Sequence, residues 1–175
     1  RVVLIERGQL GREASRASAG MLAPQAEAEG PGPFFDLCLA ARDRYLTLAD
    51  EIRNGTGEDI EYCKWGLLSL LDSTEQEAAN GRMLWQRAAG LRVEQLSGRE
   101  VRAMEPILNP EIGGALFFPD EAHIRPCTVV SGLAAGARAG GAEILENVEA
   151  IDFVLGEDRL RGVNIGGKTI LADTI

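Results

Sequence analysis

The chain has 175 residues, of which 45% are hydrophobic, and it carries a formal net charge of −9. This hydrophobic content is typical of a globular protein with its own core rather than of a disordered segment. Because nucleic acids and anionic membranes are bound through clustered lysines and arginines, the acidic balance argues against both as partners.

A short aliphatic strand opens the chain. Val2 to Ile5 form a continuous apolar run that ends in Glu6, which is typical of a buried parallel strand emerging at the carboxyl edge of a sheet. In a dinucleotide-binding unit, an acid at this position accepts hydrogen bonds from both ribose hydroxyls and repels a 2′-phosphate. Glu6 therefore indicates a nucleotide with an unphosphorylated ribose, although an ordinary α/β strand could end in the same residues.

Small residues follow this strand. Gly8, Gly11 and Gly20 interrupt a segment rich in alanine and serine, which lets backbone amides and hydroxyls approach a diphosphate or a flat ring closely. A Gly-x-Gly-x-x-Gly turn would normally lie about 20 residues before the acid. The chain begins too late to contain this turn, so we expect it to be an interior fragment of a longer protein.

The first 27 residues resemble FAD-dependent amine oxidases of the D-amino-acid oxidase family, and within it the glycine oxidases. The resemblance rests on Glu6-Arg7-Gly8, on Gly-Arg-Glu-Ala-Ser at 11–15 and, most specifically, on Ala-Gly-Met-Leu-Ala-Pro-Gln-Ala-Glu at 19–27. It implies FAD as the cofactor. The cofactor-binding residues that it implies are Glu6, Arg7, Ser15, Gly20, Met21, Leu22 and Val148.

The resemblance also implies a role for most of these residues. Glu6 would bind the ribose hydroxyls, Ser15 the diphosphate, and the backbone of residues 20–22 would lie near the isoalloxazine ring. Val148 would offer its backbone N–H and C=O to the adenine edge. Without the resemblance, Val148 would be an ordinary valine at the end of a strand.

A long helix follows a Gly/Pro-rich linker at residues 27–33. Apolar residues recur at three- and four-residue spacing from 34 to 53, and Asn54-Gly55 ends the pattern. This spacing puts Phe34 and Leu37 on the face toward the core and Arg42 on the opposite face. We expect no site on this helix.

The next elements indicate an antiparallel sheet with helices between its strands. Residues 60–71 are predicted to form a strand covered on both sides, and residues 113–118 a second strand. Ser73 and Gln76 have the spacing of a capping box, which predicts a helix to about residue 89. Ser97 and Glu100 repeat this spacing and predict a short helix through Met104.

The single histidine, His123, lies in a predicted loop at 119–126. No Gly-x-Ser-x-Gly motif and no second metal ligand at helical spacing accompany it. We therefore expect it to position the next helix rather than to act in catalysis, and we expect no metal site.

The last third of the chain returns to the cofactor-binding pattern. A helix is predicted from Pro126 to Gly140, followed by a strand at 142–146. From residue 148 to 172 the apolar residues alternate, and Gly166-Gly167 forms a tight turn, which predicts a three-stranded antiparallel meander.

Together these elements predict an α/β chain, α+β overall. We expect an incomplete FAD-binding, Rossmann-like domain of the glutathione-reductase type at 1–33 and 120–175, with the meander at 148–172. Residues 34–119 would be part of an antiparallel-sheet substrate domain with its connecting helices. The phosphate-binding turn and the C-terminal half, with the catalytic residues beyond Ile175, are expected to be absent, so the fragment alone is expected to be inactive.

The resemblance implies the activity of the full-length protein. It would oxidise the C–N bond of a small amine or amino acid such as glycine by hydride transfer to the flavin, with oxygen as acceptor. The products would be an imine or keto acid, ammonia and hydrogen peroxide, and the role would be in thiamine biosynthesis. A related D-amino-acid or sarcosine oxidase or dehydrogenase and a non-catalytic flavin-fold module stay open as alternatives, and so does a homo-oligomer.

Cysteine usage and the lack of targeting signals bear on location. Cys38, Cys63 and Cys127 are odd in number and far apart, which predicts reduced thiols rather than disulfides. The chain has no signal peptide at its start and no apolar run of about 18 residues. We expect a cytoplasmic protein.

Overall fold

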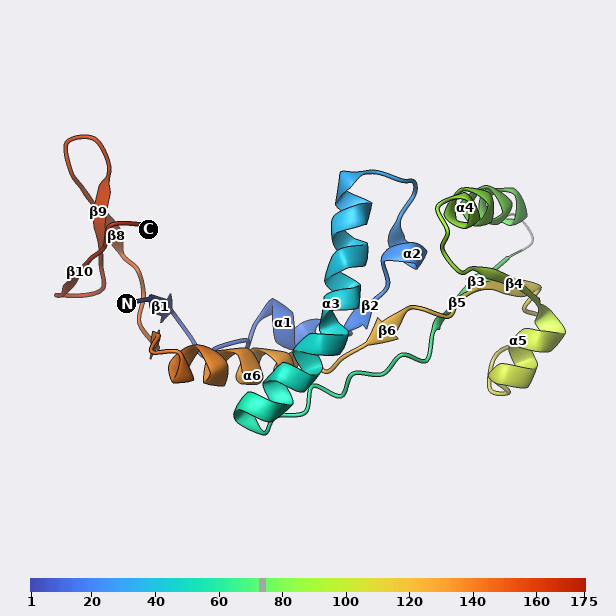
Figure 1. The fold of residues 1–175 in the computed structure, drawn as a ribbon, viewed down its shortest axis with the longest axis horizontal. Helices are drawn as coiled ribbons and strands as arrows, with labels where there is room; N and C mark the ends of the chain where they lie inside the picture. The colour runs from blue at the N-terminus through green and yellow to red at the C-terminus, as the bar shows by residue number, and fades with distance from the viewer. Residues whose placement is uncertain (73–74) are drawn as a thin grey trace. The chain divides into compact units, whose positions relative to one another are not determined.

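The computed structural model describes residues 1–72 and 75–175, and the chain divides into two compact units (Figure 1). Unit 1 comprises residues 1–19, 52–60 and 126–175, and unit 2 comprises residues 20–51 and 61–125. Each unit contains helices and strands, so the predicted mixed fold is confirmed.

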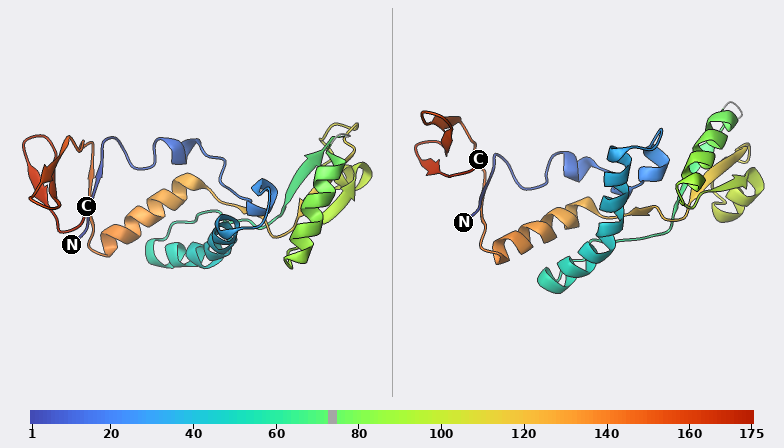
Figure 2. Two further views of the ribbon diagram at one scale, coloured as in Figure 1. Left: turned by 90° about the horizontal axis from the view of Figure 1, so that it is seen from above. Right: turned by 45° about the horizontal axis from the view of Figure 1, so that its top comes forward.

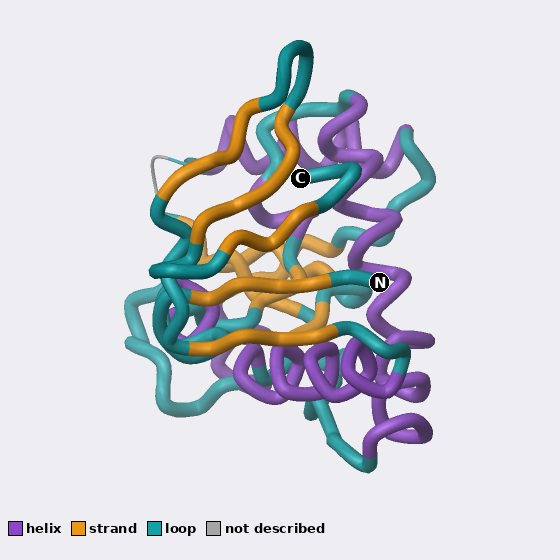
Figure 3. Tube along the Cα trace, turned by 90° about the vertical axis from the view of Figure 1, so that its left-hand side faces the viewer, coloured by secondary structure: helices purple, strands orange, loops and turns teal. Residues whose placement is uncertain are grey.

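A parallel pair of strands organises unit 1. β1 (Val3–Glu6) runs alongside β7 (Glu143–Glu146), with Val3 opposite Glu143 and Glu6 opposite Glu146; β1 starts beside the N-terminus in Figure 3. Helix α6 (Pro126–Ala139) leads into β7. Both strands and the helix are confirmed where the sequence predicts them. The carboxyl ends of the two strands lie at the same edge, which brings Glu6 close to the residues that follow β7.

Two glycines allow close packing inside unit 1. A Cβ atom at Gly132 of α6 would lie 2.4 Å from Cγ2 of Ile52, and a Cβ atom at Gly11 would lie 2.8 Å from Cγ1 of Val130. Gly11 also has a φ of +67°, in the left-handed region that favours glycine. The loop after β1 therefore approaches α6 closely, and its short helix α1 (Ala14–Ala17) contacts α6.

The predicted meander is confirmed in unit 1. Its strands β8 (Asp152–Leu155), β9 (Leu160–Asn164) and β10 (Thr169–Leu171) are antiparallel, with β9 in the centre. Gly166 and Gly167 connect the last two strands with φ values of +73° and +84°. A turn with two positive φ values is easily formed by a glycine pair.

A three-stranded antiparallel sheet forms the core of unit 2. β5 (Gly114–Phe118) lies between β3 (Leu67–Leu71) and β4 (Glu94–Ser97). Helix α4 (Gln76–Ala88) lies beside this sheet in both views of Figure 2. The buried cluster consists of Ala79, Val93, Leu116 and Phe118, with Ala26, Leu67, Leu71 and Met83 packed against it.

One of the two predicted capping boxes is confirmed. The N–H of Ser97 donates to Oε2 of Glu100 at 2.8 Å, and the Ser97 hydroxyl accepts from the N–H of Glu100, at the start of α5 (Gly98–Met104). The other box depends on Ser73, which lies outside the described residues.

A smaller strand pair carries residues 21–22. β2 (Met21–Leu22) pairs antiparallel with β6 (Ala122–His123), and Cys63 forms a bridge with His123 on the other side of β6. His123 is thus in a short strand rather than in the predicted loop. The prediction of a strand over 60–66 is wrong apart from this bridge, because Glu61 and Gly66 have positive φ values that interrupt an extended backbone.

The long helix α3 (Pro33–Thr56) is confirmed, and so is the burial of Ala49 and Ile52, but the buried face of its first half is different from the predicted one. Phe35 and Arg42 are buried, whereas Phe34 is 79% exposed and Leu37 is 65% exposed. Arg42 is buried because unit 2 supplies acceptors for its guanidinium group, as described below. The sequence also fails to predict β4 and the short helix α2 (Pro24–Glu27).

Candidate cofactor-binding site

Glu6 is the last residue of β1, and its own loop orients its carboxylate. The N–H of Gly8 donates a hydrogen bond to Oε1 of Glu6 at 2.7 Å. A carboxylate offers about four acceptor positions on its two oxygens. Glu6 therefore keeps acceptor capacity for the hydroxyl groups of a ligand, as the sequence requires of this residue.

The exit of β7 is tied to the exit of β1. Asn147 has a φ of +57°, and its N–H donates to the carbonyl oxygen of Gly8 at 2.8 Å. The N–H of Val148 donates to the carbonyl oxygen of Glu6 at 3.0 Å. Val148 thus lies beside Glu6, and its N–H is engaged by the carbonyl oxygen of that residue.

An open depression of about 320 Å³ lies at this edge, entirely within unit 1. Three of its lining residues, Glu6, Glu13 and Glu149, carry carboxylates, and Arg7 carries the one positive charge of the set. Like charges in so small a region disfavour a further anionic group such as a 2′-phosphate. The complete lining is Ile5, Glu6, Arg7, Glu13, Val148, Glu149 and Ala150.

Arg7 lies at this depression through the loop that follows β1. Its guanidinium is 3.7 Å from a carboxylate oxygen of Glu13, and both side chains are largely exposed. An exposed ion pair at this distance contributes little to stability. Arg7 can therefore turn toward a ligand at small cost.

Ser15 lies in α1, and the structure does not bring it to the depression beside Glu6. Its neighbours Arg12 and Arg16 line a second depression of unit 1, of about 240 Å³, together with Ser131 of α6. This second depression carries two exposed positive charges, whereas the first carries mainly negative ones.

Gly20, Met21 and Leu22 belong to unit 2 and form the start of the β2–β6 pair. Gly20 has a φ of +82°, and its carbonyl oxygen accepts from the N–H of Ile124 at 2.9 Å. Met21 lies opposite His123 and its side chain is 55% exposed. The backbone of this segment is held along one side by β6.

His123 is held both through its backbone and through its ring. Its N–H and C=O both bond to the backbone of Cys63, at 2.9 Å each, and its ring packs edge-on against Trp65 with centroids 5.4 Å apart. Across residues 1–72 and 75–175, no group of three or more His, Cys, Asp or Glu side chains could hold a metal ion.

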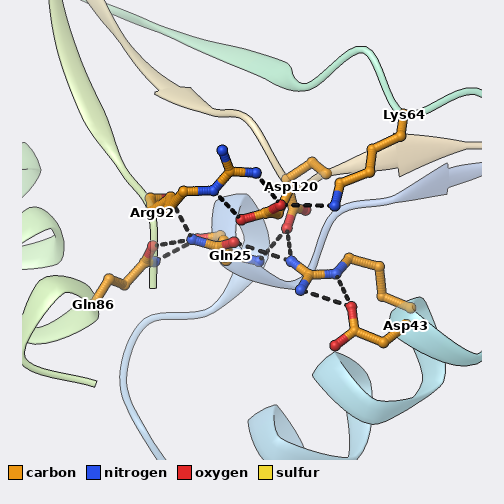
Figure 4. A network of polar contacts seen from close by, with 8 residues as sticks. Gln25, Asp43, Lys64, Gln86, Arg92 and Asp120 are labelled. Atoms are coloured by element: carbon orange, nitrogen blue, oxygen red, sulfur yellow. Dashed lines mark hydrogen bonds and ion pairs between the residues drawn. The ribbon is translucent and has the colours of Figure 1, made fainter. Parts of the chain in front are cut away.

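A buried polar network, which the sequence does not reveal, surrounds the helix that follows Leu22 (Figure 4). Gln25, Arg42, Gln86 and Glu121 are all buried, and we call these four residues the Gln25 clamp. One guanidinium nitrogen of Arg42, Nη1, lies 3.0 Å from Oε1 of Glu121 and 3.0 Å from Oε1 of Gln25. Asp43 holds the other side of the same guanidinium.

The clamp contains a carboxyl group with an unusual ionisation. Burial raises the pKa of Glu121 to about 7, although hydrogen bonds from Arg42 and from the N–H of Gln25 favour the ionised form. Its second oxygen, Oε2, has no hydrogen-bond partner within the part of the chain that the structure describes. Next to it, hydrogen bonds from Arg92 hold the pKa of Asp120 far below its usual range, and Lys64 contributes as well.

The burial of the clamp residues is not predicted by the sequence. Gln25 and Arg42 are polar residues next to apolar neighbours, and their burial depends on partners 17 to 96 positions away along the chain. Such partners cannot be identified from the local pattern. Ala150 lines the depression beside Glu6, and the sequence does not predict this because nothing distinguishes Ala150 from other small residues.

In the described part of the chain, none of the helices is both long enough and apolar enough to cross a membrane. Unit 1 contains an acidic edge beside Glu6, and unit 2 contains an extended backbone segment at residues 21–22.

Comparison with known proteins links both halves to one family. A glycine oxidase from Bacillus licheniformis is 35% identical over 146 residues, which is 83% of this chain and 38% of that protein. A D-amino acid dehydrogenase from Helicobacter pylori is 34% identical over 140 residues, 78% of this chain and 33% of that protein. The chain thus spans less than half the length of these relatives.

The fold gives the same result. The crystal structure of glycine oxidase from Geobacillus kaustophilus superposes with a TM-score of 0.91 and 31% identity, covering 99% of this chain and 47% of that one. The family model described as FAD dependent oxidoreductase (DAO) matches residues 1–174. The chain belongs to this family of FAD-dependent oxidoreductases, and FAD is the cofactor of the family.

Proposed function

We propose that the protein containing this chain oxidises the C–N bond of a small amino acid, and that glycine is its substrate. The likeness to glycine oxidases in sequence and fold supports this choice. The observation that carries the cofactor assignment is the acidic edge of unit 1, where Glu6 lies beside the residues that follow β7.

This edge fits the nucleoside end of FAD. Glu6 has acceptor capacity for two ribose hydroxyls, and the surrounding carboxylates disfavour a cofactor with a 2′-phosphate. Since the N–H of Val148 is engaged, we assign the contact with adenine to the carbonyl oxygen of Val148 and to the backbone of Ala150. Arg7 lines the same depression, and Ser15 is assigned to the diphosphate through its place in the loop after β1.

The isoalloxazine ring is assigned to the segment Gly20–Leu22. When bound, FAD would supply the acceptor for a hydride from the substrate's α-carbon, with oxygen as the final electron acceptor. The resulting imine hydrolyses to a keto acid and ammonia, and oxygen becomes hydrogen peroxide. The described residues bind and orient the cofactor, and we assign no catalytic residue among them.

A dehydrogenase is the second candidate, because the D-amino acid dehydrogenase relative is almost as similar in sequence as the glycine oxidase. The two candidates differ in the electron acceptor and in the side chain of the substrate. Peroxide formation with glycine supports the oxidase. Turnover of D-amino acids that needs an artificial acceptor and consumes no oxygen supports the dehydrogenase.

We also propose that the protein acts in the cytoplasm and supplies the product of glycine oxidation to thiamine biosynthesis. The role in thiamine biosynthesis follows from the assignment as a glycine oxidase and would fail with it if glycine is not turned over.

The experiment uses the full-length protein that contains this chain. We expect a yellow protein that binds FAD, and we expect Glu6→Ala to weaken FAD binding about tenfold or more, since about 1 kcal/mol is lost for each hydroxyl bond. Isothermal titration of FAD into the stripped protein measures this change. Glu157→Ala, an exposed carboxylate in the turn between β8 and β9, is the matched control and should bind FAD normally. A full-length protein that binds no FAD would overturn the proposed function.

A further inference from the structure

The Gln25 clamp is buried in unit 2 and follows directly after the segment assigned to the flavin. We propose that the Gln25 clamp holds Gly20–Leu22 in its cofactor-binding conformation before FAD arrives. Its four members are then positioning residues, not catalytic ones. The inference rests on the proposed function, because it assigns the flavin to this segment.

Every donor and acceptor group of Gln25 has a partner inside unit 2. Its side-chain amide donates to Oε1 of Gln86 and to the carbonyl oxygen of Arg92, at 3.0 Å each, and its side-chain oxygen accepts from Arg42 at 3.0 Å. Its backbone carbonyl accepts from Nε2 of Gln86 at 2.7 Å, and its backbone N–H donates to Glu121 at 3.3 Å. A residue bonded in all these directions can neither rotate nor shift without losing buried hydrogen bonds.

Glu121 also replaces a missing helix cap. Helix α2 begins after Ala23, whose side chain makes no capping hydrogen bond, so the first N–H groups of the helix need other acceptors. Oε1 of Glu121 accepts one of them, from Gln25. The carboxylate comes from the turn between β5 and β6, and it fixes where the chain enters α2.

The same turn leads into the strand that pairs with the flavin segment. Residues 122–123 follow Glu121 and pair with residues 21–22, and the N–H of Ile124 bonds to Gly20. The segment is thus fixed at its start by Ile124 and just beyond its end by the clamp. Holding a binding segment in its bound conformation in advance removes the cost of ordering it when the ligand binds.

A purely structural network would stabilise unit 2 without affecting the flavin. The clamp favours positioning because its central residue lies three positions after Leu22, and because its partners come from α3, α4 and the β5–β6 turn. These elements all converge on the one short helix that continues from β2.

The first test compares hydrogen exchange in the full-length protein with and without FAD. Preorganisation requires the N–H groups of Gln25 and Ile124 to be protected to the same degree in both states. Free exchange at these two positions in the FAD-free protein, with protection only after FAD is added, would overturn the inference. This measurement needs no variant, so a folding failure cannot obscure it.

The second test uses the redox potential and the visible circular dichroism of the bound flavin. In the full-length holoenzyme, Gln25→Ala should raise the Kd for FAD about tenfold, shift the flavin potential to more negative values and change the dichroism bands. The control Gln95→Ala removes an exposed glutamine of β4 in the same unit and should change none of these. A folded Gln25→Ala protein with unchanged flavin properties would overturn the inference.

A conservative variant separates positioning from charge. Glu121→Gln keeps an oxygen that can accept from both Gln25 and Arg42, so the flavin signature should be retained, whereas Glu121→Ala should alter it as Gln25→Ala does. Equal flavin properties in the two Glu121 variants would contradict the positioning role. A wild-type protein that binds no FAD would instead contradict the proposed function, which keeps the two failures distinguishable.

Discussion

The acidic edge of unit 1 and the Gln25 clamp of unit 2 use polar residues in opposite ways. At the edge, Glu6 accepts one hydrogen bond from Gly8 and keeps further acceptor capacity next to an open depression. In the clamp, Gln25 is 0% exposed and each of its polar groups is bonded within the unit. Hydrogen-bonding capacity at an open surface is available to water or to a ligand, whereas the saturated groups in the interior are already used to hold the fold.

The largest expected effect comes from breaking the clamp at its charge pair. Arg42→Met keeps the length of the side chain but leaves the Glu121 carboxylate buried without its cation. Removing one partner of a buried pair costs about 3–5 kcal/mol of the free energy of unfolding. Urea unfolding of the full-length protein at about pH 8, above the pKa of Glu121, measures this loss.

Arg44→Met is the control on the same helix. Arg44 pairs with Glu51, and both side chains are about half exposed, so its loss should cost at most about 1 kcal/mol. Equal destabilisation by the two substitutions would show that burial of Arg42 contributes nothing to stability.

The pH dependence of the free energy of unfolding provides a second test of the clamp. Burial raises the pKa of Glu121 from 4.5 to about 7, so the folded chain holds a proton on this group at pH values where the unfolded chain has released it. This contribution is fully present below about pH 4.5 and is lost as the pH rises through 7, at most about 3 kcal/mol. The groups that face Glu121 are Arg42, the N–H of Gln25 and the carboxylate of Asp120.

Glu121→Gln removes the titrating group and serves as the comparison. The free energy of unfolding, measured from about pH 5 to about pH 8, should fall more steeply for the wild type than for this variant. Parallel curves for the two proteins would exclude a proton on Glu121 in the folded state.

The smallest expected effect on stability is at the acidic edge. Glu6→Gln keeps an oxygen that can accept from the N–H of Gly8, so the free energy of unfolding without FAD should change by no more than about 0.5 kcal/mol. Thermal unfolding of the FAD-free protein checks this. A loss as large as that of Arg42→Met would place Glu6 among the structural residues and remove the contrast between the two regions.

The sequence predicts those parts of the fold whose signals are local. The aliphatic run that ends in Glu6, the alternation after residue 148 and the Gly166-Gly167 turn all give the correct strands. Proline at the start of α6 and the Ser97–Glu100 capping box give correct helix starts. Apart from β1, whose partner strand is β7, the stabilising contacts lie within a few residues of the signal.

The sequence fails where a residue's environment depends on distant partners. Arg42 reads as a solvent-facing residue because its acceptors on Gln25 and Glu121 are far away in the sequence. Residues 60–66 look apolar enough for a strand, but positive φ values at Glu61 and Gly66 interrupt it. At the candidate site, the sequence predicts the acid at the end of β1. It does not predict the hydrogen bond that the Val148 N–H donates, because this bond depends on the pairing with β1.

The pairing of β1 with β7 has a further consequence for how the protein folds. The two strands are far apart in the sequence, and the N–H of Leu10 bonds to the Glu146 side chain 136 positions away. Contacts over such separations require a large loop to close, which slows their formation relative to local hairpins and helices. We therefore expect the acidic edge to be completed late in folding, after the meander and the antiparallel sheet. FAD would then bind to a chain whose other elements are already formed.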